Sequence, residues 1–209
     1  ELGMVVWAEI PFISRFINTK EAKEDTVRQM RELIMQNYNH PSICFWGISN
    51  EITMGGESDE LVENQRILQK LCHKLDPSRK TVLANLTTVE SQSEQNKITD
   101  LSAYNVYMGW YAGKVEDCGA WMDSLHKENS DMCMGISEYG ADTNVQYHSD
   151  APKRQDYTEE YQSYYHEKML QAIQERPYLW CSFVWNMFDF AADKRKEGGT
   201  QGRNTKGYI

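Results

Sequence analysis

Short, continuous apolar runs alternate along this chain with longer segments in which apolar residues recur every three or four positions. Runs of the first kind are typical of β-strands that are covered on both faces. They lie at residues 4–8, 43–49, 81–84, 103–107, 133–137 and 180–185. The intervening segments have the spacing of amphipathic helices, most clearly at residues 27–38, 61–75 and 161–173. This alternation predicts parallel strands joined by helical crossovers, which is an α/β fold.

The spacing of the apolar runs distinguishes between two α/β architectures. Successive runs begin about 35 residues apart on average, which is close to the ~31 residues per unit of a (β/α)8 TIM barrel. A doubly wound sheet is the alternative, but no glycine-rich phosphate loop follows any of the runs. We therefore predict that residues 1–209 form one partial TIM-barrel domain.

The charge and hydropathy of the chain argue against two classes of partner. Its 31 acidic and 22 basic residues give a net charge of −9. An acidic surface disfavours nonspecific binding to the phosphates of nucleic acids. No apolar run approaches the ~18 residues of a membrane span, and the mean hydropathy is −0.68. We expect neither a nucleic-acid partner nor a membrane.

The cysteines and the chain ends bear on the cellular location. The five cysteines include no Cys-x-x-Cys pair, so we expect buried, reduced thiols, for which a cytoplasmic location is the best fit. The first residues, Glu1-Leu2-Gly3-Met4, do not resemble a signal peptide. Both ends look cut from a larger domain, so the loss of a targeting signal upstream stays open.

Two of the apolar runs end in a polar residue followed by a glutamate, Asn50-Glu51 and Ser137-Glu138, and the active sites of barrels form where the strands end. Glu51 follows the run at residues 43–49, and Glu138 follows the run at residues 133–137. A carboxylate at the end of a buried strand is costly unless it is paired or takes part in chemistry. Two that face one cleft suit glycoside hydrolysis, with one ionised nucleophile and one proton donor. The alternative is that both are helix N-caps or solvated strand ends.

The residues around both glutamates carry a specific resemblance. Residues 39–51 (Asn-His-Pro-Ser-Ile-Cys-Phe-Trp-Gly-Ile-Ser-Asn-Glu) and 137–141 (Ser-Glu-Tyr-Gly-Ala) resemble the acid/base and nucleophile signatures of glycoside hydrolase family 2. This is the family of retaining β-galactosidases and β-glucuronidases. The resemblance covers essentially the whole chain and implies barrel strands 3 to 8, without the first two strands and the last helix. It also implies β-sandwich domains upstream in the parent chain, and a homo-oligomer is a further expectation.

The resemblance assigns roles to individual residues. Glu51 would be the acid/base and Glu138 the nucleophile of a double displacement with retention, their carboxylates ~5–5.5 Å apart. Asn50 would hydrogen-bond the sugar 2-hydroxyl, and Tyr107 would hydrogen-bond the nucleophile. Trp185 would form an apolar platform for the sugar. We expect that no cofactor is required for these steps, and a part for Mg or Na is not readable from the sequence.

Several other residues have two interpretations. Glu9 follows the first apolar run and is a candidate for contact with the substrate or an ion, or for a structural hydrogen bond. His40 stands at the start of its strand, opposite the chemistry, and is interpreted as structural. Trp110 would line the cleft or the core. Residues 194–196 (Lys-Arg-Lys) are interpreted as part of a solvated loop.

The sugar specificity depends on elements in the second half of the chain. Asn204-Thr205-Lys206-Gly207 is similar to the element with which β-glucuronidases hold the uronate carboxylate, so Asn204 and Lys206 are substrate-binding candidates. Residues 146–153 and 186–193 look more like those of bacterial β-galactosidases. We therefore expect hydrolysis of terminal β-D-galactosides, with β-glucuronidase activity as the alternative. A catalytically inactive barrel fragment that binds sugar weakly is the alternative of another class.

Overall fold

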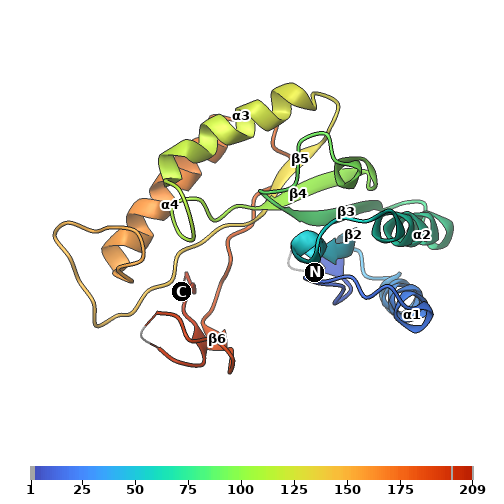
Figure 1. Cartoon of the computed structure of the whole chain (residues 1–209), viewed down its shortest axis with the longest axis horizontal. Helices are drawn as coiled ribbons and strands as arrows, with labels where there is room; N and C mark the ends of the chain where they lie inside the picture. The colour runs from blue at the N-terminus through green and yellow to red at the C-terminus, as the bar shows by residue number, and fades with distance from the viewer. Residues whose placement is uncertain (1–2, 199, 209) are drawn as a thin grey trace. The chain divides into compact units, whose positions relative to one another are not determined.

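The structure is a computed structural model that describes residues 3–198 and 200–208 of the chain (Figure 1). Within these residues, five strands form a sheet whose spatial order, β1-β2-β3-β4-β5, is also their order in the sequence. The strands are β1 (Val6–Glu9), β2 (Ile43–Asn50), β3 (Lys80–Leu86), β4 (Leu101–Asn105) and β5 (Met134–Glu138). β1 pairs with β2, and β2 with β3, in parallel. The expected α/β fold with parallel strands is confirmed.

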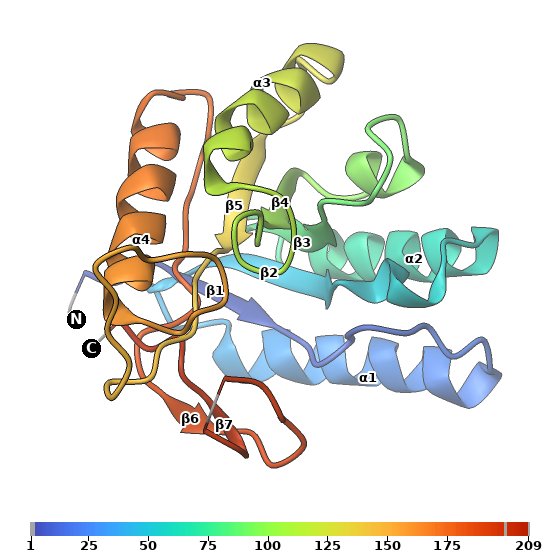
Figure 2. The same ribbon diagram turned by 60° about the vertical axis from the view of Figure 1, so that its left-hand side comes forward.

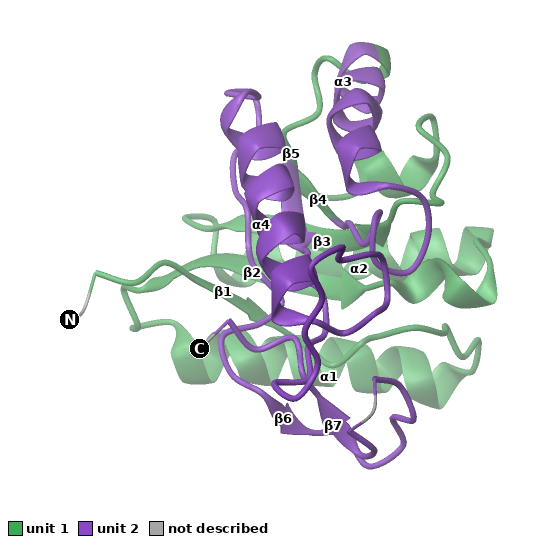
Figure 3. Ribbon diagram, turned by 90° about the vertical axis from the view of Figure 1, so that its left-hand side faces the viewer, with its two compact units in different colours: residues 1–104, 128–134 green, residues 105–127, 135–209 purple. Residues whose placement is uncertain are grey.

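The chain divides into two compact units (Figure 3). Unit 1 comprises residues 1–104 and 128–134, and unit 2 comprises residues 105–127 and 135–209.

Unit 1 contains two helices that follow β1 and β2 in the sequence. Helices α1 (Lys20–Asn37) and α2 (Asp59–Leu75) run side by side and pack on β2 (Figure 2). Short 3-10 helices, η1 (Ile52–Gly55) and η2 (Glu94–Lys97), follow β2 and β3. The buried core joins strand residues to one face of each helix and includes Trp46, Ile48, Met30, Ile34, Leu61 and Leu68. Burial of these apolar faces is the main source of stability in such a layered unit.

The helices begin where a hydroxyl side chain can satisfy a backbone N–H group of the first turn. Thr19 accepts a hydrogen bond from the N–H of Ala22 at the start of α1, and Ser58 accepts one from Leu61 at the start of α2. In unit 2, Thr158 does the same for Tyr161 at the start of α4. Such caps each contribute about 1 kcal/mol.

Unit 2 contains η3 (Val115–Asp117), most of α3 (Cys118–Glu128), α4 (Glu159–Gln174) and a small antiparallel pair, β6 (Phe190–Ala191) with β7 (Arg203–Asn204). The hydroxyl of Tyr165 on α4 donates to the carbonyl oxygen of Val106 at 3.2 Å. Arg176, just after α4, donates to Asp123 on α3 at 2.7 Å. These contacts hold the two helices of this unit together and join α4 to the segment that follows β4.

The expected strand at residues 180–185 is wrong in part. Only Ser182 forms a strand-like bridge, in parallel with Ile136 of β5. Backbone hydrogen bonds along the run all reach β5 or the residue after it, as in the bonds from Phe183 to Ile136 and from Trp185 to Tyr139. The run is therefore an extended segment along β5 and not a strand.

The remaining predictions concern the helices, the cysteines and membrane spans. Helices lie where the three periodic segments predicted them, and α3 is an additional helix. All five cysteines are free thiols, but Cys133 is exposed, contrary to the expectation of buried thiols. Among the described residues, no helix is long and apolar enough to span a membrane.

A buried carboxylate holds the end of α2 in unit 1. Asp76, directly after the helix, is completely buried (0 % exposed). Its carboxylate accepts hydrogen bonds from the indole of Trp46 at 3.0 Å, the guanidinium of Arg79 at 2.6 Å and the N–H of Ser78 at 3.0 Å. Burial by itself would raise the pKa of Asp76, but the bonds from Ser78, Arg79 and Trp46 outweigh it and lower this pKa to about 2.

We expect Asp76→Asn to lower the free energy of unfolding by about 3 kcal/mol at pH 7, because it leaves a buried guanidinium without its counter-charge. A folded-state pKa of about 2 lies below the unfolded value near 3.9, so the charge of Asp76 stabilises the fold above pH ~4. That contribution is lost as the pH falls through the folded value. Urea unfolding at pH 7 and pH 3 measures both effects, with the exposed Asp131→Asn as control. An equal loss in both variants, or a loss independent of pH, contradicts this account.

Candidate active site

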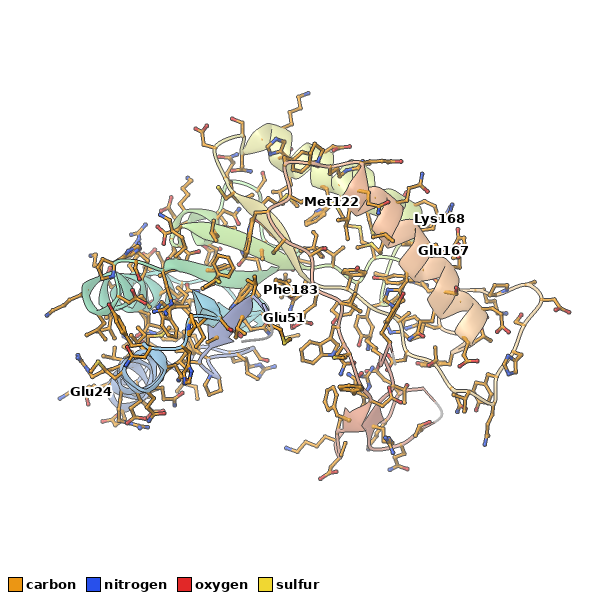
Figure 4. All side chains as sticks on the ribbon, turned by 180° about the vertical axis from the view of Figure 1, so that it is seen from behind. Glu24, Glu51, Met122, Glu167, Lys168 and Phe183 are labelled. Carbon is orange, nitrogen blue, oxygen red and sulfur yellow. The ribbon has the colours of Figure 1, made fainter. Side chains whose placement is uncertain are left out.

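In unit 1, three of the sequence-predicted residues lie at the carboxyl ends of neighbouring strands. Glu9 is the last residue of β1, and Asn50 is the last residue of β2. Glu51, which is labelled in Figure 4, follows Asn50. Parallel pairing sets Glu9 beside Gly47 of β2 and Asn50 beside Ala84 of β3. All three are partly exposed. The strand pairing therefore gathers them at one edge of the sheet, as expected.

The backbone at Glu51 is strained. This residue has φ +48° and ψ +27°, in the left-handed region that side chains with a Cβ rarely adopt. Its N–H donates to the carbonyl oxygen of Ala84 at 2.9 Å, which continues the pairing of β2 with β3 up to Glu51. A non-glycine residue in this region costs of order 1–3 kcal/mol and is found most often at functional sites. The conformation supports a functional reading of Glu51 over a helix cap.

The approach of Glu9 to β2 requires a glycine. A Cβ at position 47 would lie 2.7 Å from the Cβ of Glu9 and would overlap the indole of Trp7. That indole donates a hydrogen bond to the carboxylate of Glu9 at 3.1 Å. Glu9 therefore has at least a structural hydrogen bond, one of its two interpretations.

In unit 2, the structure joins Tyr107 to Glu138. The phenol of Tyr107 donates to Oε2 of Glu138 at 2.7 Å, and the N–H of Val106 donates to the Glu138 carbonyl at 2.7 Å. Burial raises the pKa of Tyr107, and the negative charge of Glu138 and the hydrogen bond to it raise it further. The phenol therefore stays protonated and remains a donor to the carboxylate.

Trp185 lies at the same end of unit 2. Its N–H donates to the carbonyl oxygen of Tyr139, the residue after Glu138, at 2.8 Å. Its side chain is 36 % exposed and packs edge-to-face on Phe190. A Cβ on Gly140 would collide with the carbonyl oxygen of Trp185, so this close approach requires glycine. An exposed indole in this place has the form of a sugar platform.

The candidates Asn204 and Lys206 are both buried. Asn204 uses its side-chain oxygen to accept from the backbone N–H of Lys206 at 3.1 Å. The ammonium of Lys206 is 1 % exposed, lies 2.5 Å from Asp142, and donates to the hydroxyl of Tyr111 at 2.8 Å. It also lies over the ring of Tyr107, at 5.6 Å from the centroid. Lys206 is thus connected through Tyr107 to Glu138.

The partners of Lys206 were not predicted from the sequence. Asp142 is 2 % exposed and is the carboxylate that pairs with Lys206, and it also accepts from the indole of Trp110 at 3.1 Å. Trp110 is completely buried, so its core interpretation holds. The interpretation of residues 194–196 as a solvated loop is wrong for Arg195, whose side chain is 13 % exposed and lies 2.7 Å from Asp142. An isolated aspartate two residues after a glycine carries little sequence signal, and its charged partners, Arg195 and Lys206, lie more than fifty residues away.

The described residues hold no group of three or more His, Cys, Asp or Glu side chains that could bind a metal ion.

A parallel sheet with helical crossovers, with carboxylates at the carboxyl ends of its strands, defines the class of TIM-barrel glycosidases. The comparison with protein families agrees with this class. The model of the TIM barrel domain of glycosyl hydrolases family 2 matches residues 3–200. The chain belongs to this family.

Individual relatives cover the whole chain. A β-glucuronidase of Bacteroides fragilis is 39 % identical over an alignment of 219 residues, which covers 99 % of this chain and 31 % of that protein. The crystal structure of an FMN-binding β-glucuronidase from Facaelibacterium prausnitzii L2-6 is 54 % identical with a TM-score of 0.98, over 100 % of this chain and 32 % of that one. A putative β-galactosidase from Bacteroides fragilis is 35 % identical with a TM-score of 0.92, over 100 % of this chain and 31 % of that one. The chain spans about a third of the length of these relatives.

We expect Tyr107→Phe to lower kcat/KM for an aryl glycoside by roughly 10- to 100-fold, because a hydrogen bond to a charged group contributes about 1.5–3 kcal/mol. The exposed Tyr147→Phe in the same unit serves as control. Steady-state kinetics in the full-length protein measures the effect. Equal activity of the two variants would show that the bond to Glu138 has no catalytic role.

Proposed function

We propose that the chain is the catalytic barrel of a β-glucuronidase, a glycosidase that hydrolyses terminal β-D-glucuronides with retention of configuration. The observation that carries the sugar assignment is the buried charge cluster of Lys206, Arg195 and Asp142 in unit 2. The relatives named β-glucuronidases, at 39 % and 54 % identity, support the same sugar. The expected β-galactosidase activity has less support, from a putative β-galactosidase at 35 % identity.

The charges in this cluster suit an anionic sugar. Two cations, the buried Lys206 and the largely buried Arg195, lie within hydrogen-bond distance of the buried carboxylate of Asp142. The second carboxylate at Arg195, that of Glu197, is 50 % exposed. A uronate carries a carboxylate on C6, and cations are its natural partners. A galactoside is neutral and has no group that would match the additional positive charge. An unmatched buried charge is unfavourable without such a ligand.

Tyr111 offers a donor beside these cations. Its hydroxyl oxygen accepts from Lys206 at 2.8 Å and lies 3.4 Å from a guanidinium nitrogen of Arg195. Because the oxygen faces two donors, the O–H proton is directed to another acceptor. The side chain is 46 % exposed and so can be reached by a ligand. Burial of the hydroxyl raises the pKa of Tyr111 to about 12, which keeps it a donor at neutral pH.

The proposed chemistry is a double displacement. Glu138 attacks the anomeric carbon, and Glu51 gives its proton to the leaving oxygen. Glu51 then takes a proton from water, and the water oxygen replaces Glu138 on the anomeric carbon, so that the configuration is retained. Tyr107 holds the Glu138 carboxylate through the bond of 2.7 Å. Asn50, next to Glu51, would hydrogen-bond the sugar 2-hydroxyl, and Trp185 would cover the apolar face of the sugar.

An assay of aryl β-D-glucuronide beside aryl β-D-galactoside tests the proposed function in the full-length protein. We expect glucuronide turnover that Glu138→Gln lowers by at least about 10³-fold, because an amide cannot act as the nucleophile. The exposed Glu175→Gln serves as control. Galactoside turnover with the same dependence on Glu138 would keep the mechanism and change the sugar. Turnover of neither sugar would favour the inactive barrel.

The role of Glu51 has a distinct kinetic signature. We expect Glu51→Gln to slow an alkyl glucuronide by roughly 10²- to 10⁴-fold, the usual contribution of a general acid. A dinitrophenyl glucuronide should be slowed much less in its first step, since its leaving group departs without a proton. The exposed Glu57→Gln of the same unit is the matched control. Equal slowing of both substrates would contradict the acid role.

A further inference from the structure

The carboxylate of Asp142 is fully occupied by donors. Its Oδ2 accepts from Lys206 at 2.5 Å, Arg195 at 2.7 Å and the indole of Trp110 at 3.1 Å. Its Oδ1 accepts from the backbone N–H of Thr205 at 3.1 Å and from its hydroxyl at 3.3 Å. Asp142 is 2 % exposed. Because both of its oxygens accept hydrogen bonds, the carboxylate of Asp142 is held in one position, and the two cations are bound to it.

Within the described part of the chain, the side chain of Arg195 has a hydrogen-bond donor without a partner, unlike the carboxylate of Asp142. One guanidinium nitrogen makes all its contacts with Asp142, Tyr111 and Glu197. Its Nε is buried, and among residues 3–198 and 200–208 it has no hydrogen-bond partner. Burial lowers the pKa of Arg195, but Asp142, Tyr111 and Glu197 together outweigh burial and raise this pKa, so the side chain stays charged.

The other carboxylate at Arg195 is a weak counter-charge. Glu197 lies 3.1 Å from the guanidinium, but its side chain is 50 % exposed. Water screens the charge of an exposed side chain far more than that of a buried one. Away from solvent, the cluster therefore has two positive charges, those of Lys206 and Arg195, and one negative charge, that of Asp142. Because Asp142 is already paired with Lys206, the charge of Arg195 is the one in excess.

We infer that Arg195 is a specificity-determining residue, whose charge, held by Asp142 beside Lys206, makes this site prefer a sugar carboxylate over a neutral group. This inference rests on the proposed β-glucuronidase function. It goes beyond the Asn-x-Lys-Gly element, because Arg195 lies outside that element and acts through its charge. Charges interact strongly where water is excluded, so a cation at this place affects the binding of an anion even without direct contact.

A purely structural role for Arg195 has different consequences. Its N–H donates to the carbonyl oxygen of Ala192, and its carbonyl oxygen accepts from Gly202, so the residue also belongs to the connection between β6 and β7. If Arg195 only held this connection on Asp142, its loss would affect all substrates alike. A role in selecting charge predicts an effect on anionic substrates alone. The ratio of kcat/KM for two substrates that differ only in charge separates the two roles.

The experiment compares an aryl β-D-glucuronide with its neutral C6 carboxamide in the full-length protein, with thermal unfolding as a check on folding. We expect Arg195→Gln to lower kcat/KM for the glucuronide by roughly 10- to 100-fold, mainly through KM, and to leave the carboxamide within about threefold. Arg195→Lys restores the charge and should recover most of the wild-type ratio of kcat/KM for the glucuronide to kcat/KM for the carboxamide. Glu197→Gln, which removes the opposing charge, should raise this ratio by about two- to threefold.

Arg203→Gln is the matched control, since it removes an exposed arginine of the same unit. It should leave both substrates within about twofold. A parallel fall of both substrates in Arg195→Gln, or an unchanged ratio, would overturn the inference while the glucuronidase function stands. Wild-type protein that hydrolyses another glycoside but no glucuronide would overturn the proposed function as well, and this is measured before any variant is made.

Discussion

The buried ion pair between Lys206 and Asp142 is the interaction on which the arrangement of unit 2 depends. It joins two segments more than sixty residues apart, one just after β5 and the other just after β7. Neither charge could be buried alone, because an isolated ion in the interior costs several kcal/mol. The pair therefore fixes the C-terminal segment at the end of β5, where Glu138 lies. From there Lys206 reaches the ring of Tyr107, the residue that hydrogen-bonds Glu138.

Unit 1 contains a second buried carboxylate, that of Asp76, which stabilises the fold and lies away from the candidate site residues. Asp76 and Arg79 lie at the amino-terminal side of the strands, where Arg79 also donates to the carbonyl oxygens of Tyr38, His40 and Ile43. Every charge in that group is matched, and the contacts join the end of α2 to the segment before β2. In TIM barrels the amino-terminal face contributes stability and the carboxyl-terminal face contributes function. The structural interpretation of His40 agrees with this division, because its backbone takes part in the group.

The sequence allowed the prediction of features that depend on local pattern. The apolar runs located β1 to β5, and the carboxylates of Glu51, directly after β2, and Glu138, the last residue of β5, were found because a charge at the end of a buried strand is unusual. Features that depend on distant partners were not predictable. Arg195 stands between two lysines and has the composition of a solvated loop, but its contact with Asp142 draws it largely out of solvent. The run at residues 180–185 has the composition of a strand, but of its residues only Ser182 forms a strand-like bridge.

The contrast between the two buried carboxylates indicates which one serves binding. A group whose role is stability gains nothing from an excess of one charge, and the group around Asp76 has none. The group around Asp142 places two cations on one carboxylate, and burial together with the nearby Arg195 lowers the pKa of Lys206 against the opposing effect of Asp142. Such an arrangement is less stable than a matched pair would be, since like charges repel and each loses water. A ligand that carries a negative charge would offset this cost, and under the proposed function the carboxylate of the sugar would do so. The charge of the sugar would then bear on Arg195 and Asp142 as well as on Lys206.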